Sequence, residues 1–136
     1  MTQAARTLSD FGDRNPGELI HLFKAGLSAT LFGQVASCLQ VSERQLANIV
    51  SIPVSTLTRR KRAGRLNTVE SERVYRMIRI YNRAMEVLGS DEAATRWIHT
   101  KIKALGWQTP FSYADTEIGA REVEAVLGRI DHGVFS

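Results

Sequence analysis

The residue types that most often carry catalysis are few and scattered in this chain. His21, His99 and His132 lie far apart, and none has a cysteine or a paired carboxylate nearby at metal-ligand spacing. Glu122 and Glu124 are next-but-one neighbours, which places them on different faces of a helix. The sequence also has no glycine-rich phosphate loop and no context for a Ser–His–Asp set. We therefore expect a protein that is not an enzyme and that has no cofactor and no metal site.

Positive charge is more informative, because it is concentrated in the middle of the sequence. Residues 1–58 carry four basic and four acidic side chains, residues 59–103 carry twelve against five, and residues 104–136 carry two against five. The net charge of +4 thus hides a basic centre and an acidic tail. Such a stripe favours a polyanionic partner, although a charge run is more often only the solvated face of a helix.

The densest cationic segment, "TRRKRAGR", places five cations within seven positions and contains no acid. Hydroxyl side chains come just before it. Short hydroxyl groups suit hydrogen bonds to phosphates or base edges, and arginine binds guanine or phosphate. We predict the following DNA-binding residues: Ser55, Thr56, Thr58, Arg59, Arg60, Arg62 and Arg65.

The elements that would position these side chains are two short helices. Ser42 and Gln45 form a capping-box pattern that opens the first, and a second runs from about residue 54 to Gly64. The three residues 51–53 between them give the spacing of a helix-turn-helix, whose second helix lies in the major groove of DNA. Ala47 supplies the small residue that this motif requires. Ser51 stands where many such turns have glycine, which suggests a variant turn geometry.

Caps and apolar spacing predict helices in most of the remaining chain, and no segment alternates as a strand would. We expect an all-α fold: a helix-turn-helix bundle at residues 16–66, then a helical dimerisation region at residues 67–136, with residues 1–15 as a flexible arm. The predicted helix starts lie near Asn15, Ser28, Ser42, Val54, Asn67, Ser90 or Asp91, Thr109, and Asp115 or Thr116. The last helix should turn Ile118, Val123, Val126, Leu127 and Ile130 inward and end at Gly133.

Three further expectations concern assembly and location. One short DNA-binding helix covers few base pairs, so we expect a homodimer that binds two half-sites. No apolar run approaches the roughly 18 residues of a membrane span, and the first residues lack the apolar core of a signal peptide. The single cysteine, Cys38, lies on an apolar helical face and suits a reducing compartment. We expect a cytoplasmic protein without a membrane partner.

The segments "TLTRRKRAGRLNTVESERVYRMIRIYNRAMEVLG", "DEAATRWIHT" and "WQTPFSYADTEIGAREVEAVLGRIDHGVFS" closely resemble the Xre/MbcA/ParS-type antitoxins. The tail is the most specific part, with Thr109-Pro110, Thr116-Glu117, Gly119-Ala120 and the run from Leu127 to Ile130. The resemblance covers roughly residues 26–136. It implies an antitoxin of a bacterial type II system, paired with a RES-domain toxin that degrades NAD.

The same resemblance implies two functional ends. DNA contact belongs to residues 55–65, through which the antitoxin would repress its own operon. Toxin contact belongs to the last helix and the tip, and residues 128–136 would enter or cover the NAD site. The toxin-binding residues are expected to be Arg121, Glu124, Gly128, Arg129, His132, Gly133, Val134, Phe135 and Ser136. The alternative is a free-standing helix-turn-helix repressor without a toxin, and a toxin gene next to this one would distinguish the two.

Overall fold

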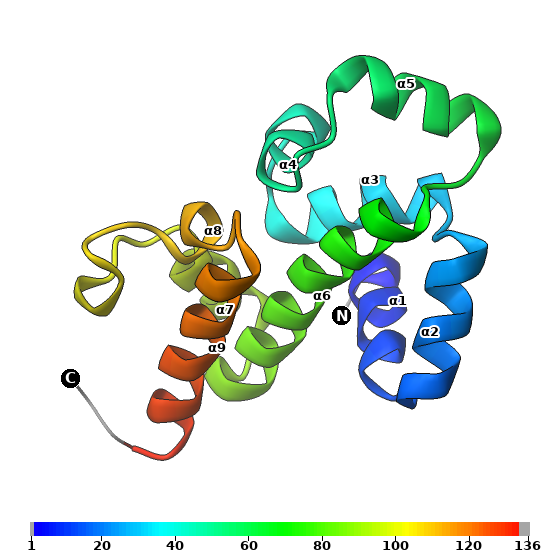
Figure 1. The fold of residues 1–136 in the computed structure, drawn as a ribbon. Helices are drawn as coiled ribbons and strands as arrows, with labels where there is room; N and C mark the ends of the chain where they lie inside the picture. Colours follow the sequence, from blue (N-terminus) through cyan, green and yellow to red (C-terminus); the bar gives the residue numbers. More distant parts are fainter. Residues whose placement is uncertain (1, 134–136) are drawn as a thin grey trace. The chain divides into compact units, whose positions relative to one another are not determined.

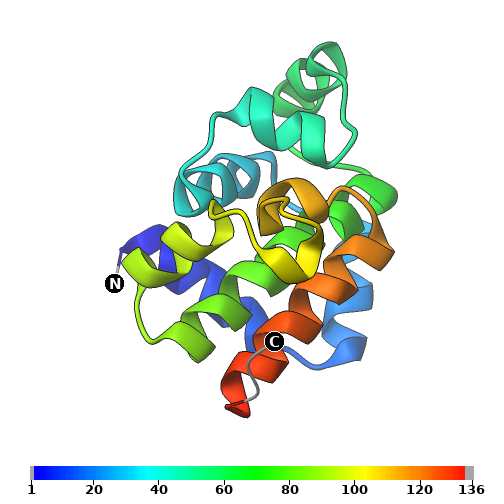
Figure 2. The same cartoon turned by 90° about the vertical axis from the view of Figure 1, so that its left-hand side faces the viewer.

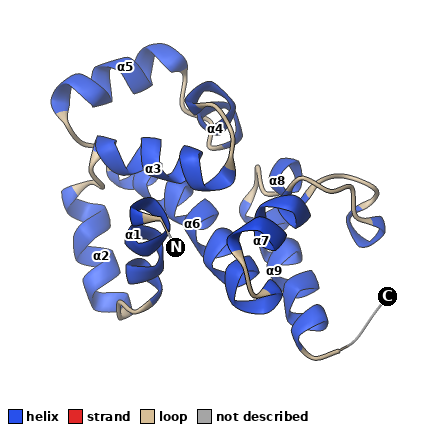
Figure 3. Cartoon of the chain, turned by 180° about the vertical axis from the view of Figure 1, so that it is seen from behind, coloured by secondary structure: helices blue, strands red, loops and turns tan. Residues whose placement is uncertain are grey.

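The computed structural model describes residues 2–133, and these residues form helices and turns without any strand (Figure 3). The all-α class predicted from the sequence is therefore confirmed. The chain divides into two compact units after Ile78, within the long helix α6 (Thr68–Leu88). The sequence-based boundary after residue 66 lies instead just before the start of this helix.

The first unit is arranged around α3 (Ala29–Leu39), which packs against α1 (Gln3–Gly12), α4 (Glu43–Ile49) and α5 (Val54–Ala63) (Figure 1). Helix α2 (Pro16–Ala25) and the start of α6 complete it. Phe32, Val35 and Leu39 of α3 are fully buried in its core. The helices begin where the caps predict: the side chains of Asn15, Ser28 and Ser42 each accept a hydrogen bond from a backbone N–H in the first turn.

The flexible arm predicted for residues 1–15 is wrong, because residues 3–12 form helix α1. Thr2 caps this helix by accepting a hydrogen bond from the N–H of Ala5, and Ala5, Leu8 and Phe11 are buried. A spacing of three residues puts these apolar side chains on one face. So short a helix is marginal in isolation and is stable only through the packing of that face.

The second unit contains the end of α6, helices α7 (Asp91–Ile98), α8 (Pro110–Tyr113) and α9 (Glu117–Asp131), and the short 3-10 helix η1 (Lys103–Leu105). Helix α8 packs against α7 and α9, the latter drawn from orange to red in Figure 2. The caps of the three α-helices that begin in this unit are Ser90, Thr109 and Thr116.

One residue expected in the core of this unit is at the surface. Ile118 is 75% exposed, whereas Val123 and Leu127 of the same helix are fully buried. Ile118 precedes Val123 by five positions, a rotation of about 140° around the helix. Ile118 therefore does not lie on the buried face of α9. Ile130, also expected inward, is half-buried.

Candidate functional sites on α5 and α9

The turn between α4 and α5 closes as a regular helix C-cap. The N–H of Ile52 donates to the carbonyl oxygen of Ala47 at 2.8 Å, and the N–H of Ser51 donates to that of Asn48 at 3.3 Å, which is the Schellman pattern. Ser51 itself takes the left-handed conformation, with φ 57°. The variant geometry suggested by the absence of glycine is therefore not observed, and Ser51 bears the strain instead.

Helices α4 and α5 pack against each other through apolar residues, and Ala47 lies where a small residue was predicted. Ala47 is fully buried, so the backbones of α4 and α5 can approach closely. The apolar side chains of the two helices and of the turn between them are all buried: Leu46, Val50, Ile52 and Leu57. This arrangement fixes which side of α5 is turned away from the domain.

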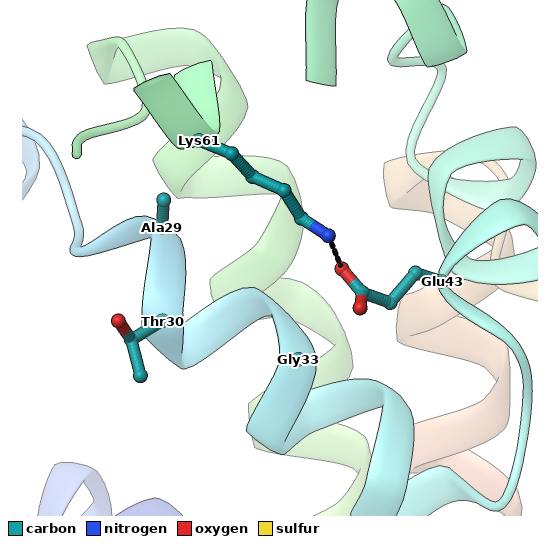
Figure 4. Close-up of a pocket in the computed structure, with 5 residues that line it drawn as sticks. All are labelled: Ala29, Thr30, Gly33, Glu43 and Lys61. Carbon is teal, nitrogen blue, oxygen red and sulfur yellow. Dashed lines mark ion pairs between the residues drawn. The ribbon is translucent and has the colours of Figure 1, made fainter. Parts of the chain in front are cut away.

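Several cations of the predicted DNA-binding cluster make contacts inside the protein. Nε of Arg60 lies 2.8 Å from Oε1 of Glu70, at the start of α6. Nζ of Lys61 lies 2.6 Å from Oε1 of Glu43 on α4, across a hollow bordered by α3 (Figure 4). Nη1 of Arg65 donates to the carbonyl oxygen of Gly26 at 3.1 Å. Of the five cations, these three therefore stabilise the unit, and Arg60 is half-buried.

The side of α5 opposite Leu57 carries the remaining predicted residues. Ser55, Thr58, Arg59 and Arg62 are exposed, and Arg59 donates to the hydroxyl of Thr56 at 3.3 Å. The hydroxyl of Thr58 donates to the carbonyl oxygen of Val54 at 3.1 Å, within the helix. This face of α5 thus presents two long cationic side chains and short hydroxyl groups to the solvent. Such side chains can contact the phosphates and base edges of DNA.

Glu70 connects the start of α6 with α5. The same oxygen that binds Arg60 accepts the N–H of Asn67 at 2.9 Å, and the side chain of Asn67 accepts the N–H of Glu70 at 2.8 Å. Burial by itself would raise the pKa of Glu70, but the hydrogen bonds and charges around it, chiefly those of Arg60, lower the pKa below its usual range. Glu70 is therefore ionised and structural.

A hollow of about 460 Å³ lies beside this turn and was not predicted from the sequence. It includes Arg44 and Asn48 of α4 and Val54 at the start of α5. Val54 is exposed although its three-residue spacing to Leu57 puts the two side chains on the same side of α5, because Val54 is the first residue of the helix. An apolar residue at the first position of an otherwise polar helix is the sequence signal that would have identified it.

The predicted toxin-binding residues of α9 are not equivalent. Arg121, His132 and Gly133 are exposed, while Gly128 and Arg129 are half-buried. Gly133 adopts φ 72°, as expected for a residue through which the chain leaves the helix in a left-handed turn. Val134, Phe135 and Ser136 lie outside the described residues.

Glu124, predicted to contact the toxin, participates in an ion-pair network of the second unit. Nε of Arg79 lies 2.8 Å from Oε1 of Glu124, and Nη2 of Arg79 lies 3.2 Å from Oε1 of Glu117. Burial alone would lower the pKa of Arg79, but these two carboxylates raise it. The end of α6 is thereby joined to α9, so Glu124 is already engaged within the unit.

Two family models match the chain, and they follow closely the division into two units near Ile78. Residues 18–79 match the antitoxin Xre-like helix-turn-helix domain, and residues 83–133 match the antitoxin Xre/MbcA/ParS C-terminal toxin-binding domain. Antitoxin Xre of Yersinia enterocolitica is 36% identical over 87% of this chain and 81% of its own length. The chain belongs to the Xre/MbcA/ParS antitoxins.

Antitoxin Xre of Photorhabdus laumondii is also similar, at 30% identity over 85% of this chain and 79% of that protein. The protein is thus a type II antitoxin with a DNA-binding helix-turn-helix, formed by α4 and α5, and a C-terminal toxin-binding domain. Across residues 2–133 of this antitoxin, no helix is long and apolar enough to cross a membrane. The same residues contain no group of three or more His, Cys, Asp or Glu side chains placed to bind a metal ion.

Proposed function

We propose that this antitoxin neutralises a RES-domain, NAD-degrading toxin by covering its active site, and that it represses its own operon by binding operator DNA. The observation that supports this most directly is the combination, in one chain, of an exposed cationic face on α5 and a domain of the toxin-binding family. In this proposal, residues 16–66 bind DNA and residues 67–136 mediate dimerisation and toxin binding, in the cytoplasm.

For DNA binding, Arg59 and Arg62 are the central residues, with Ser55 and Thr58 beside them. All four are exposed on the side of α5 away from the core, so they reach the major groove without disturbing the unit. A homodimer would place two such helices on successive half-sites of the operator. Arg60 and Arg65 support the helix and its neighbouring turn from within.

For neutralisation, we propose that the end of α9 and the residues after it contact the toxin. The backbone takes a left-handed conformation at Gly133, with φ 72°, two residues after the end of α9. Burying one phenylalanine side chain in a cleft contributes about 1.5–3 kcal/mol, which is enough to anchor a short tip. We propose that residues 128–136 enter or cover the NAD-binding cleft.

Deletion of residues 133–136 tests this function. The antitoxin is co-expressed with the proposed RES-domain toxin, and cellular NAD and colony formation are measured. The truncated protein should bind DNA as the full chain does, but NAD should fall and growth should stop. The Arg59→Ala, Arg62→Ala double variant is the matched control, and it should protect cells fully while losing the operator. If the truncated chain preserves NAD as well as the full chain, occlusion by the tip is wrong.

A further inference from the structure

We propose that a hollow at the start of α9 is a second docking site for the toxin, and that it receives an arginine or lysine side chain from the toxin's surface. This inference rests on the proposed toxin partner, but it concerns a surface other than the tip. The hollow has a volume of about 330 Å³. Its lining residues are Gln108, Tyr113, Asp115, Thr116, Ile118, Gly119 and Glu122.

The floor of the hollow is rigidly built. The hydroxyl of Thr116 accepts the N–H of Gly119 at 3.0 Å, which caps α9. At Gly119 the helix approaches α8 so closely that an added Cβ would lie 1.8 Å from the carbonyl oxygen of Tyr113. Only glycine fits there. The hollow therefore exists before any partner binds, and its shape costs no ordering on association.

The acidic residues of the second unit indicate the charge of the partner. Glu117 and Glu124 are paired with Arg79, and Asp131 is paired with Arg83. Asp115 and Glu122 make no ion pair within residues 2–133, and both line the hollow. Two carboxylates suit the guanidinium of arginine or the ammonium of lysine, whereas a bound metal ion would require more ligands than this site offers.

The apolar surroundings indicate a protein partner instead of a free cation. Ile118 lines the hollow and is 75% exposed. Trp107, which precedes the lining residue Gln108 in the chain, is 63% exposed and has a left-handed φ of 64°. The N–H of Trp107 donates to the carbonyl oxygen of Ile102 at 2.9 Å, which stabilises this strained conformation. An exposed aliphatic group beside unpaired charges, as Ile118 is in this hollow, is typical of an interface anchor, and this surface lies within the domain that the toxin-binding family model matches.

The two contacts would then have different roles. The tip would block the toxin's active site, and the hollow would supply affinity through a charged contact flanked by apolar ones. Loss of the hollow should weaken the complex and raise the amount of antitoxin needed for protection. Loss of the tip should abolish protection while much of the affinity remains.

The test is a binding titration of the full-length antitoxin with the purified RES-domain toxin of the proposed function. The Asp115→Asn, Glu122→Gln double variant should bind about tenfold more weakly or worse, and Ile118→Ala should weaken binding several-fold. Glu92→Gln removes an exposed carboxylate of α7, and Ile20→Ala truncates an isoleucine of α2 that is 53% exposed. Both matched controls should bind as the wild type does. Thermal melts and operator binding of all variants should be unchanged, since the altered side chains are at the surface.

Each outcome decides a separate question. If the wild-type protein itself does not bind the toxin, the proposed function fails. If the wild type binds and the hollow variants bind within twofold of it, the docking site is wrong while the proposed function stands. If the variants instead dissociate a homodimer that the wild type forms, the hollow is a contact between copies of this chain, and the docking proposal is overturned.

Discussion

Nε of Arg60 lies 2.8 Å from Oε1 of Glu70, so the most buried cation of the basic segment joins α5 to the first turn of α6. The carboxylate is only 6% exposed and also accepts the N–H of Asn67. Because α5 carries the proposed DNA-contacting face, this ion pair fixes the orientation of that face on the domain. In the proposed function, Arg60 therefore positions the face that Arg59 and Arg62 present to DNA.

Arg60→Ala should therefore lower the free energy of unfolding by about 2 kcal/mol, since it leaves a buried carboxylate without its charged partner. Arg59→Ala, one position earlier on the exposed face, should change it by less than about 0.5 kcal/mol. Urea titration followed by circular dichroism gives both values. Equal losses for the two variants would mean that Arg60 has no special structural role.

The Arg59→Ala, Arg62→Ala double variant should lose operator binding and retain its fold. Each arginine that contacts a guanine contributes about 1–3 kcal/mol of discrimination between bases, whereas one that contacts phosphate weakens binding to every sequence alike. Gel-shift titrations on the operator and on a scrambled duplex distinguish these roles. Unchanged affinity on both duplexes would show that this side of α5 is only a solvated face.

The stability of the first unit should depend on pH through Glu70. Its pKa is lowered in the folded protein, so its ionised form contributes stability above the pKa of glutamate in the unfolded chain, about 4.3. That contribution should disappear as the pH falls through the lower folded-state pKa. Glu70→Gln should be less stable at neutral pH and should show a smaller loss between neutral and acidic pH. A set of urea midpoints across this range measures the difference between the two proteins.

Ser51→Gly should stabilise the protein by about 0.5–1 kcal/mol, because glycine adopts the left-handed conformation without steric cost. The side chain of Ser51 is exposed, so little else is lost. Ser51→Val is the opposite control, since a β-branched residue is strained at positive φ. Thermal unfolding should rank the proteins glycine, serine, valine, and any other order would contradict the strain at this turn.

Gly119→Ala should destabilise the second unit by more than about 3 kcal/mol, because its Cβ would overlap the carbonyl oxygen of Tyr113 and force α8 and α9 apart. Gly128→Ala in the same helix meets no atom within 4 Å and should stabilise α9 by up to about 1 kcal/mol. Differential scanning calorimetry of the two variants provides the comparison. A mild effect of Gly119→Ala would show that the two helices can separate at little cost.

The parts of the structure that followed from the sequence are those determined by neighbouring residues. The caps at Asn15, Ser42 and Thr116 depend on side chains that bind the backbone two or three residues away, and each was correctly placed or included among two choices. The turn at residues 51–53 and the buried contacts of Leu57 follow from the same local rules.

The sequence is less informative where distant residues decide the outcome. Helix α1 was missed although Thr2 can cap it and its apolar residues have helical spacing, because so short a helix depends on packing against α3, which the sequence does not show. Arg60 was assigned to DNA because its charge is visible in the sequence, while its pairing with Glu70 depends on how two helices meet. Glu124 was assigned to the toxin for the same reason, although Arg79 engages it within the unit. A formal charge in a sequence does not show whether it is already neutralised.

The two ion pairs that α5 makes within its own unit also reduce the expected dependence of DNA affinity on salt concentration. Each phosphate that a free cation neutralises releases condensed counterions, so the logarithm of affinity falls with that of salt concentration by about 0.9 per phosphate contact. The carboxylates of Glu70 and Glu43 already partly neutralise Arg60 and Lys61 in the free protein. If α5 contacts DNA as proposed, the ionic-strength dependence should be set mainly by Arg59, Arg62 and Arg65, and it should be shallower than five cations would give.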